Sequence, residues 1–379
     1  MDRKPTIRDI ARQAGVSPAT ASLALRNDPR LRKDTCSKVQ HVAEDLGYHP
    51  NALMSQLLAQ LRTTRTPKYQ ATLALVNASE RATIMSEVQT FREWERGSLE
   101  RATQLGYGVD KFWLYEEDMS PQRLATIFRA RNIRGVIVAA CVDNSRLPRD
   151  FDEIWKGFAC VLLGVSNVRQ LSHLACNDQY MTGRQAFQEA IRLGYRQPAL
   201  VISEGIDSLV EGRFSGSFLS AQNLHPAKQR VPPFFFHSQL DKPITAKIGT
   251  PEILKRFGQW YERHQPDVII CIHPEIKDWV ESLRLSVPKD VGLIHLDWNE
   301  ELKGWAGMNQ NNHLVGAAGI DMLIGQLHRN ELGIPSFPKC LMVESSWVMG
   351  QTVRQQPVPK KHPCVADNGV KKKANSRHR

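Results

Sequence analysis

Short apolar runs alternate with amphipathic stretches of helical length from residue 71 to residue 345. This alternation is typical of parallel sheets that are covered by helices on both faces. The expected strands lie at 71–76, 111–115, 135–140, 160–165, 198–203, 267–272, 291–296 and 340–345. The expected helices lie at 86–105, 121–131, 180–193, 211–222, 251–264, 275–284 and 313–329. Because about 285 residues is long for one such sheet, the sequence predicts two similar α/β lobes.

The segments on either side of this region have a different character. Residues 6–46 suit three short helices, residues 52–61 suit one more, and RTTRTPKYQ at 62–70 suits a linker. Residues 356–379 have the polar, lysine-rich composition of a disordered tail. We therefore expect four parts, at 1–50, 51–70, 71–355 and 356–379. Within the third part, one lobe is expected at about 71–176 and 298–327, and the other at about 177–297 and 328–355.

Positive charge is concentrated at both ends of the chain. The formal net charge is +11, and residues 1–68 hold 12 basic against 6 acidic side chains. Residues 354–379 hold 8 against 1, so the middle of the chain is nearly neutral. Basic ends on a neutral body suggest a polyanionic partner. For the run around Lys371–Lys373 and Arg377, a solvated end is the commoner explanation, and added affinity for DNA is the alternative.

The sequence disfavours several classes of protein. The N-terminus lacks the apolar segment of a secretory signal and no run is long enough to span a bilayer, so we expect a cytoplasmic protein. Seven cysteines without a CxxC pair predict buried free thiols rather than a zinc site or a disulfide framework. The Gly-x-Ser-x-Gly, His-Glu-x-x-His, P-loop and complete dinucleotide motifs are missing, so we expect neither an enzyme nor a cofactor.

The first two helices of the N-terminal segment have the pattern of a helix-turn-helix. Thr6 is placed to cap the first helix, with Asp9 three residues later, and Gly15 ends it. Ser17 caps the second helix and Pro18 stands at its favoured first position. The third helix is expected to start at Asp34 or Thr35. The small residues where the first two helices would cross are Ala11, Gly15, Val16 and Ala21.

The second of these helices has the residues needed to enter a DNA groove. Its outward or N-terminal face would carry Ser17, Ala19, Thr20, Ser22 and Leu23. Hydroxyl groups near a helix N-terminus suit phosphate contacts, because the backbone N–H groups and the helix dipole attract anions there. A small helical bundle that contacts another protein is the alternative, and such a bundle would not require the basic charge of the segment.

The same segment resembles the DNA-binding headpiece and hinge of the LacI/GalR family, the lactose-repressor type. The matching motifs are Ile10-Ala11, Ala14-Gly15-Val16-Ser17, Thr20-x-Ser22, Thr35, Val39 and Leu46-Gly47-Tyr48-x-Pro50-Asn51. The resemblance implies an all-α helix-turn-helix headpiece at 1–50, a hinge helix within 51–70, and a two-lobed sensor at 71–355 that is similar to periplasmic binding proteins. It also implies a homodimer that reads near-palindromic double-stranded DNA beside the nucleoid, as a repressor.

The resemblance assigns roles to individual headpiece residues. Those that would hold phosphates or set the register are Thr6, Ser17, Thr20, Ser22, Thr35, Tyr48 and Asn51. Pro18, Ala19 and Leu23 would face base edges, and Leu57 would be the hinge leucine that wedges into the minor groove. Many relatives have arginine where this chain has Leu23, so the DNA sequence that it reads is not predicted. The hinge also lacks the common Ala-Arg-Leu pattern.

The resemblance places an effector site between the lobes of the sensor. Arg213 lies in a segment similar to the family's Arg-x-x-Gly-Phe/Trp motif, and Asp297 follows a strand where relatives have Gly-Tyr-Asp. Together with Asn77 they are the expected effector-binding residues, and a carbohydrate is the expected effector. An interlobe salt bridge is the alternative for Arg213, and a helix cap is the alternative for Asp297.

Two further features bear on the effector. Tryptophans 94, 298 and 305 could stack on a sugar ring, although packing is the more frequent role of tryptophan. Gly164 stands where some sugar-responsive relatives have aspartate, which points to a different effector. The resemblance implies that effector binding shifts the lobes and thereby alters the affinity for DNA. The competing hypotheses are an enzyme on a similar doubly wound scaffold and a transport solute-binding protein, and the basic headpiece argues against the second.

Overall fold

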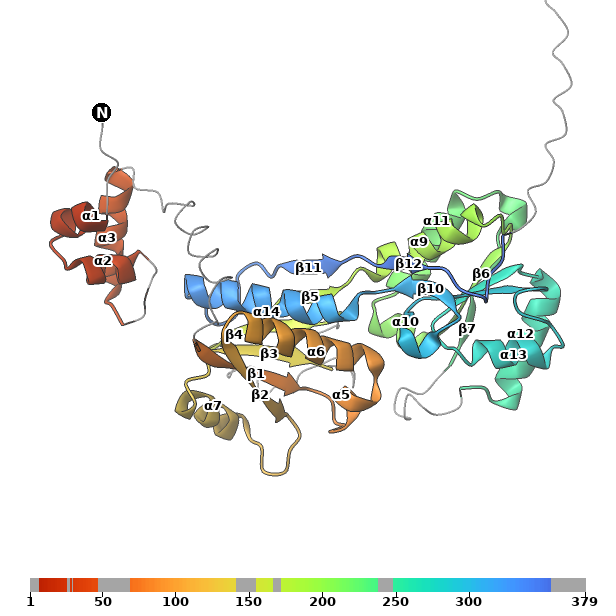
Figure 1. Cartoon of the computed structure of the whole chain (residues 1–379), viewed down its shortest axis with the longest axis horizontal. Coiled ribbons are helices and arrows are strands. Elements are labelled where there is room, and N and C mark those ends of the chain that lie inside the picture. The colour runs from red at the N-terminus through yellow and green to blue at the C-terminus, as the bar shows by residue number, and fades with distance from the viewer. Residues whose placement is uncertain are drawn as a thin grey trace, which may run out of the picture.

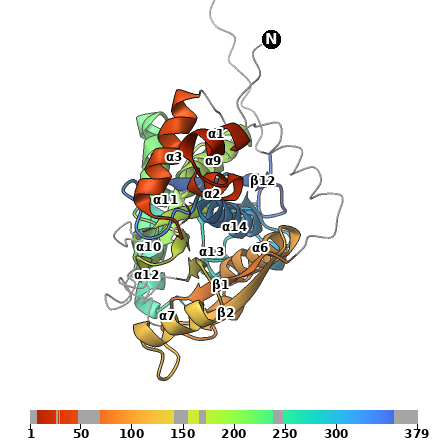
Figure 2. The same cartoon turned by 90° about the vertical axis from the view of Figure 1, so that its left-hand side faces the viewer.

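The computed structural model describes residues 7–25, 28, 30–46, 69–140, 155–165, 172–237 and 248–355. They form a three-helix N-terminal unit and an α/β body with two sheets (Figures 1 and 2). Four expected DNA-binding residues lie outside this part of the chain, and so do the expected hinge helix at 52–61 and the tail at 356–379. These four residues are Thr6, Tyr48, Asn51 and Leu57.

The N-terminal unit consists of α1 (Ile7–Ala14), α2 (Pro18–Ala24) and α3 (Lys33–Asp45). The turn between α1 and α2 is made by Gly15, whose φ of 68° is a backbone conformation that glycine adopts without strain. The helices enclose a small core of buried apolar side chains, namely Ile10, Ala11, Ala14, Ala21, Ala24, Cys36, Val39 and Ala43. The expected start of the third helix at Asp34 or Thr35 is wrong, because α3 begins at Lys33 and no side chain caps it.

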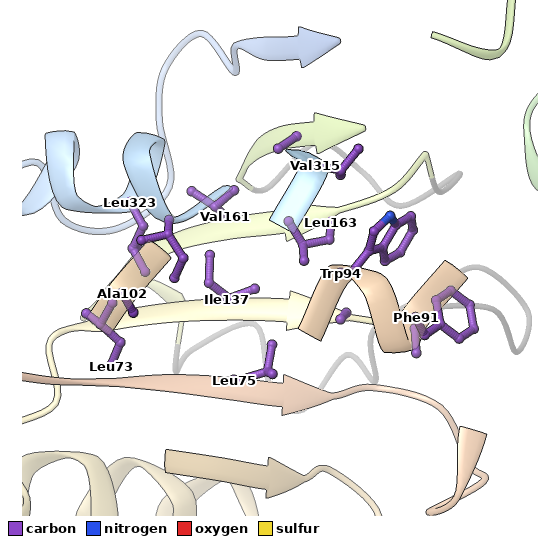
Figure 3. Packing of buried hydrophobic residues seen from close by; sticks show 14 of the residues in the cluster. Leu73, Leu75, Phe91, Trp94, Ala102, Ile137, Val161, Leu163, Val315 and Leu323 are labelled. Atoms are coloured by element: carbon purple, nitrogen blue, oxygen red, sulfur yellow. The ribbon is translucent and has the colours of Figure 1, made fainter. Parts of the chain in front are cut away.

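The first lobe is built on a six-stranded parallel sheet of order β11-β5-β4-β3-β1-β2. Its strands are β1 (Ala71–Asn77), β2 (Tyr107–Trp113), β3 (Gly135–Ala139), β4 (Ala159–Leu163), β5 (His173–Asn177) and β11 (Cys340–Val343). Helices α6 (Gln89–Gln104) and α14 (Asn312–Arg329) pack on one face, where their side chains meet Leu73, Ile137 and Val161 (Figure 3). Helix α7 (Pro121–Ala130) covers the other face, and α5 (Ile84–Glu87) precedes α6.

The second lobe is built on a sheet of order β12-β10-β9-β8-β6-β7, in which only β12 runs antiparallel to its neighbour. Its strands are β6 (Pro198–Ser203), β7 (Phe234–Phe236), β8 (Val268–Cys271), β9 (Gly292–His295), β10 (Ala306–Asn309) and β12 (Ser346–Val348). Helices α9 (Gln179–Arg192) and α11 (Arg213–Asn223) cover one face. Helices α12 (Pro251–His264) and α13 (Ile276–Ser282) cover the other, and α10 (Glu204–Leu209) follows β6.

The chain crosses between the lobes three times, after β5, after β10 and after β11. We expected 298–327 in the first lobe and 328–355 in the second, but β10 belongs to the second sheet and β11 to the first. The second and third crossovers therefore lie between 309 and 312 and between 343 and 346. The expected bounds missed both crossovers because β10 is a four-residue strand that contains glycine, which weakens a strand pattern.

The alternation of strands and helices is confirmed, with differences at individual elements. The strand expected at 111–115 is β2, which spans Tyr107–Trp113. It lies at the edge of the sheet and its side chains are mostly half-buried, so its first residues do not form the apolar run that marks a buried strand. Strand β5 was missed because it buries two polar side chains, His173 and Asn177. The short elements β7, β10, β12, α5 and α10 were not predicted either.

The cysteine side chains are thiols wherever the structure describes them. Cys36, Cys160, Cys176 and Cys271 are buried, whereas Cys340 is exposed on β11. The sulfur atoms of Cys176 and Cys340 lie 3.5 Å apart on neighbouring strands. Among the described helices, none has the length and apolarity needed to cross a membrane.

Candidate functional site

The N-terminus of α2 presents a capped and exposed surface. The hydroxyl oxygen of Ser17 accepts a hydrogen bond from the backbone N–H of Thr20 at 3.0 Å, and Pro18 occupies the first turn. The predicted cap is therefore confirmed. Ser17, Pro18 and Ala19 are exposed, and Thr20 and Leu23 are half-buried. The hydroxyl oxygens of Ser17 and Thr20 also lie 2.8 Å apart, so one of the two hydroxyls donates to the other. The other O–H is left to donate to a phosphate.

Basic side chains gather where α3 begins. Arg30, Arg32 and Lys33 are exposed there, and Thr35 lies half-buried in the first turn of α3. Arg30 donates to both carboxylate oxygens of Asp28, at 2.9 and 2.8 Å. These hydrogen bonds lower the pKa of Asp28 to about 2. The side chain of Ser22, expected to face DNA, is outside the described part of α2.

A cavity of about 360 Å³ lies between the two lobes. Its size suits a small molecule. The first lobe contributes side chains from the segment 81–94 and from 163–165, and Phe91 and Trp94 of this set are seen in Figure 3. The second lobe contributes Ile206, Leu209, Val210 and Phe214 around α10, and polar side chains that follow the strands β8 and β9. Ligands of α/β sheets bind at this end of parallel strands.

Asp297 follows β9 and holds the two lobes together at the cavity. Its carboxylate accepts hydrogen bonds from the Thr90 hydroxyl at 2.8 Å and from the Asn312 amide at 2.9 Å, and both partners belong to the first lobe. Burial raises the pKa of Asp297 to about 6, although these two hydrogen bonds oppose the shift. The alternative role of helix cap does not apply, because Asn299 caps the short helix that follows.

Two histidines beside Asp297 are held neutral by burial. Burial lowers the pKa of His295 to about 3 and that of His273 to about 4. Nδ1 of His295 accepts a hydrogen bond from the backbone N–H of Asp297 at 3.1 Å. Nε2 of His273 lies 3.0 Å from the hydroxyl of Ser203. Sequence reasoning missed both histidines, although each directly follows or ends an apolar strand that was predicted.

The structure does not bring the other two expected effector residues to the cavity. Arg213 begins α11, and its guanidinium lies 3.5 Å from Glu211 and 3.9 Å from the sulfur of Met342. Glu211 belongs to the same lobe, so the pair is not the interlobe salt bridge considered as an alternative. Asn77 uses its amide within the first lobe, donating to the carbonyl oxygens of Arg81 and Ala82 at 3.1 Å.

Trp94 and Gln179 are cavity residues that the sequence did not single out for their polar atoms. Nε1 of Trp94 and Oε1 of Gln179 are buried and have no hydrogen-bond partner among the described residues. Trp298 and Trp305 do not line the cavity. Trp94 explains why residue 164 is a glycine, because a Cβ atom at this position would lie 2.6 Å from the indole ring. An aspartate there, as in some relatives, would displace Trp94.

The described part of the chain contains no group of three or more side chains that could hold a metal ion. Residues 6–51 match the family described as "Bacterial regulatory proteins, lacI family". The N-terminal unit is therefore a DNA-binding domain of the lacI family. Over 59 residues the chain is 48% identical to the HTH-type transcriptional regulator GalS of Salmonella typhimurium, which is 16% of this chain and 17% of that protein.

The two-lobed body also has solved counterparts of the same fold. The structure of the transcriptional regulator CelR–cellobiose complex aligns with a TM-score of 0.55 and 17% identity, over 92% of this chain and 99% of CelR. The Lac repressor dimer bound to operator and the anti-inducer ONPF aligns with a TM-score of 0.53 and 17% identity, over 93% and 100% of the two chains. At this identity the likeness establishes the fold, which confirms the predicted combination of headpiece and two-lobed body.

Proposed function

We propose that the chain is a sequence-specific transcriptional regulator, acting as a repressor, whose affinity for its operator is controlled by a small ligand in the interlobe cavity. The observation that carries this proposal is the exposed N-terminus of α2, where Ser17 caps the helix and Pro18 and Ala19 face solvent. A helix presented in this way fits the major groove, with hydroxyls and backbone N–H groups directed at phosphates.

The proposed division of labour in the headpiece follows from exposure and chemistry. Ser17, Thr20 and Thr35 set the position on the phosphate backbone, while Pro18, Ala19 and Leu23 contact base edges. Leu23 is apolar and suits a thymine methyl group rather than the hydrogen-bonding edge of guanine. Outside the described residues, we assign phosphate contacts to Thr6, Tyr48 and Asn51, with Ser22 joining them from α2, and the minor-groove wedge to Leu57.

A second copy of the chain is the proposed partner of the first lobe. Strand β11 is the edge of the first sheet, and the apolar side chains of Leu341 and Met342 on it are exposed. Ile334 and Phe337, just before the strand, are exposed as well, and Phe337 is 85% exposed. Exposed edges with apolar side chains are typical of surfaces that pair with another chain. A symmetric dimer would present two headpieces to a near-palindromic operator.

The ligand is proposed to be a small neutral compound of the carbohydrate class. Asp297, Thr90 and Asn312 offer the directional hydrogen-bonding groups that hydroxyls require, at the junction of the lobes. A ligand hydroxyl that replaces Thr90 or Asn312 at the carboxylate of Asp297 would change how the lobes are held together. Ligand binding is then linked to DNA binding, because the ligand favours one arrangement of the lobes. We infer no catalytic step for this cavity.

Selection from a random duplex library tests the proposal. Purified full-length chain is incubated with the library at moderate salt, and bound duplexes are amplified and sequenced. We expect enrichment of a motif with two related half-sites, because two headpieces of a dimer read the same sequence in opposite orientations. A library that remains random after several rounds, with the protein folded and dimeric, would contradict the proposal.

A further inference from the structure

Three buried polar atoms in the lining of the interlobe cavity have no hydrogen-bond partner among the described residues. They are the indole Nε1 of Trp94, the amide oxygen Oε1 of Gln179 and the ring Nε2 of His295, and these residues are 6%, 6% and 3% exposed. Buried polar groups in folded proteins nearly always form a hydrogen bond. An indole can only donate and an amide oxygen can only accept, and Nε2 of His295 carries the proton because Nδ1 accepts from the backbone of Asp297. A ligand that satisfies all three atoms must therefore offer acceptors as well as a donor. Hydroxyl groups supply the two together.

The charges of the described lining residues do not suit an anionic ligand. Among the described lining residues, Arg81 is the one cation, and it is already paired with Glu87. Glu301 is paired with Arg92, and Asp297 receives its hydrogen bonds from uncharged side chains. Of the two lining histidines, His295 is buried and His273 is half-buried, and desolvation lowers the pKa of both, so they are neutral. Among the described lining residues, a phosphate or carboxylate would therefore meet acidic side chains without finding a free cation to bind it.

Most of the cavity wall is apolar. The first lobe contributes Ile84, Val88, Phe91 and Leu163, and the second lobe contributes Ile206, Leu209, Val210, Phe214 and Ile272. A free sugar carries hydroxyl groups around its whole ring and would leave several of them unpaired against this wall. An apolar group of ring size would instead bury its surface there with a favourable free energy.

From these three observations, and given the proposed function of the cavity as an effector site, we infer that its ligand is a neutral amphipathic molecule. One end carries hydroxyl groups that bond Trp94 and Gln179, and the other end is a ring-sized apolar group. A neutral glycoside with an aromatic aglycone has this chemistry, whereas a free sugar lacks the apolar group and a sugar phosphate carries a charge. Trp94 stands on α6 of the first lobe and Gln179 begins α9 of the second, so this ligand bridges the lobes.

Calorimetric titration of the full-length protein with matched pairs of glycosides tests the inference. The probes are the phenyl and methyl β-glycosides of glucose, galactose and xylose, with glucose 6-phosphate as the anionic probe. We expect at least one phenyl glycoside to bind at least tenfold more tightly than its methyl partner, and no heat from the phosphate. Equal binding of the phenyl and methyl partners, tighter binding of the phosphate, or no binding by any phenyl glycoside would overturn the inference.

Variants of two of these residues, Trp94 and Gln179, test whether they contact the ligand. Trp94→Phe keeps an aromatic ring but removes the N–H group, and Gln179→Met keeps the length but removes the amide. Each is expected to weaken the best phenyl glycoside about tenfold, the usual size of one lost hydrogen bond. Trp155→Phe is the matched control, because Nε1 of Trp155 is also buried and unpartnered but lies in a core outside the cavity. Equal effects of Trp94→Phe and Trp155→Phe would overturn the assignment.

The selected DNA duplex separates this inference from the proposed function. In the absence of glycoside, the chain and its Trp155→Phe variant are expected to bind the duplex equally. Retained duplex binding with no response to any phenyl glycoside overturns the ligand class and leaves the regulator intact. Glycoside binding by a chain that shows no preference for any duplex overturns the regulator and leaves the ligand class intact.

Discussion

The hydroxyl of Thr90 in the first lobe donates a hydrogen bond of 2.8 Å to the carboxylate of Asp297 in the second. Asn312, from the first lobe, donates to the other oxygen of the same carboxylate. Asp297 therefore holds the two lobes at the wall of the cavity, at a point where an incoming hydroxyl competes for the same atoms. The carboxylate is the group most directly placed to couple ligand binding to the arrangement of the lobes.

Asp297→Asn is expected to stabilise the protein at neutral pH. Burial raises the pKa of Asp297 from 3.8 to about 6, so the folded state binds a proton more readily than the unfolded state. The free energy of unfolding then falls as the pH rises from about 4 to 6 and stays lower above that range. Thermal melts should show the variant more stable by about 2 kcal/mol at pH 7.5, and equal to the parent near pH 4. A constant difference across this range would contradict the assignment.

Thr90→Val is expected to weaken the contact between the lobes. The substitution keeps the shape of the side chain and removes the donor, which leaves one oxygen of an ionised carboxylate without its partner. Chemical denaturation at pH 7.5 should show a loss of about 1–3 kcal/mol. The loss should shrink below pH 5, where Asp297 is protonated in the parent as well. Thr126→Val is the control, since the hydroxyl of Thr126 bonds only within α7.

Ser17→Asp is expected to separate the folding role of Ser17 from its role at DNA. Aspartate caps a helix as well as serine does, so the stability of the headpiece should be retained. Its charge would face a phosphate, so affinity for the selected duplex should fall at least tenfold. Ser17→Ala should lose about 1 kcal/mol of stability instead. Ser120→Ala is the matched control, because Ser120 caps α7 ahead of a proline in the same way and lies in the body; it should leave DNA affinity unchanged.

Gly164→Ala is expected to destabilise the first lobe and to reduce glycoside affinity. Gly164 has a φ of 92°, and an added Cβ would lie 2.6 Å from the ring of Trp94. Gly304→Ala carries the same kind of backbone strain, with a φ of 98°, but its Cβ would meet nothing within 4 Å. Denaturation should show Gly164→Ala to be less stable than Gly304→Ala by about 1–3 kcal/mol. Equal losses would mean that the backbone alone requires glycine at 164.

Local signals in the sequence were enough to predict the headpiece. The end of α1 at Gly15 and the start of α2 at Ser17-Pro18 depend on residues within a few positions of each other, and the structure has both. The start of α3 was predicted wrongly, because it has no side-chain cap to mark it. Long apolar runs likewise predicted the central strands of both sheets.

Contacts between distant segments explain what the sequence did not predict. His173 and Asn177 make β5 look polar, yet they are buried because they bond Lys339 and Gln310, far along the chain. The guanidinium of Arg213 contacts Glu211 and Met342, which is distant in the sequence, so its position in a family motif did not place it in the cavity. The polar atoms of Trp94 and Gln179 are notable only because the described part of the folded chain offers them no hydrogen-bond partner.

Competition binding between the selected duplex and a scrambled duplex of the same base composition tests the central claim most directly. The full-length chain is titrated with both at about 150 mM salt, an ionic strength at which exposed charges more than about 8 Å apart are largely screened. The account predicts a preference of at least a thousandfold for the selected duplex, which base contacts from α2 would provide. Equal affinity for the two duplexes would mean that the headpiece reads only the phosphate backbone, and would contradict the account.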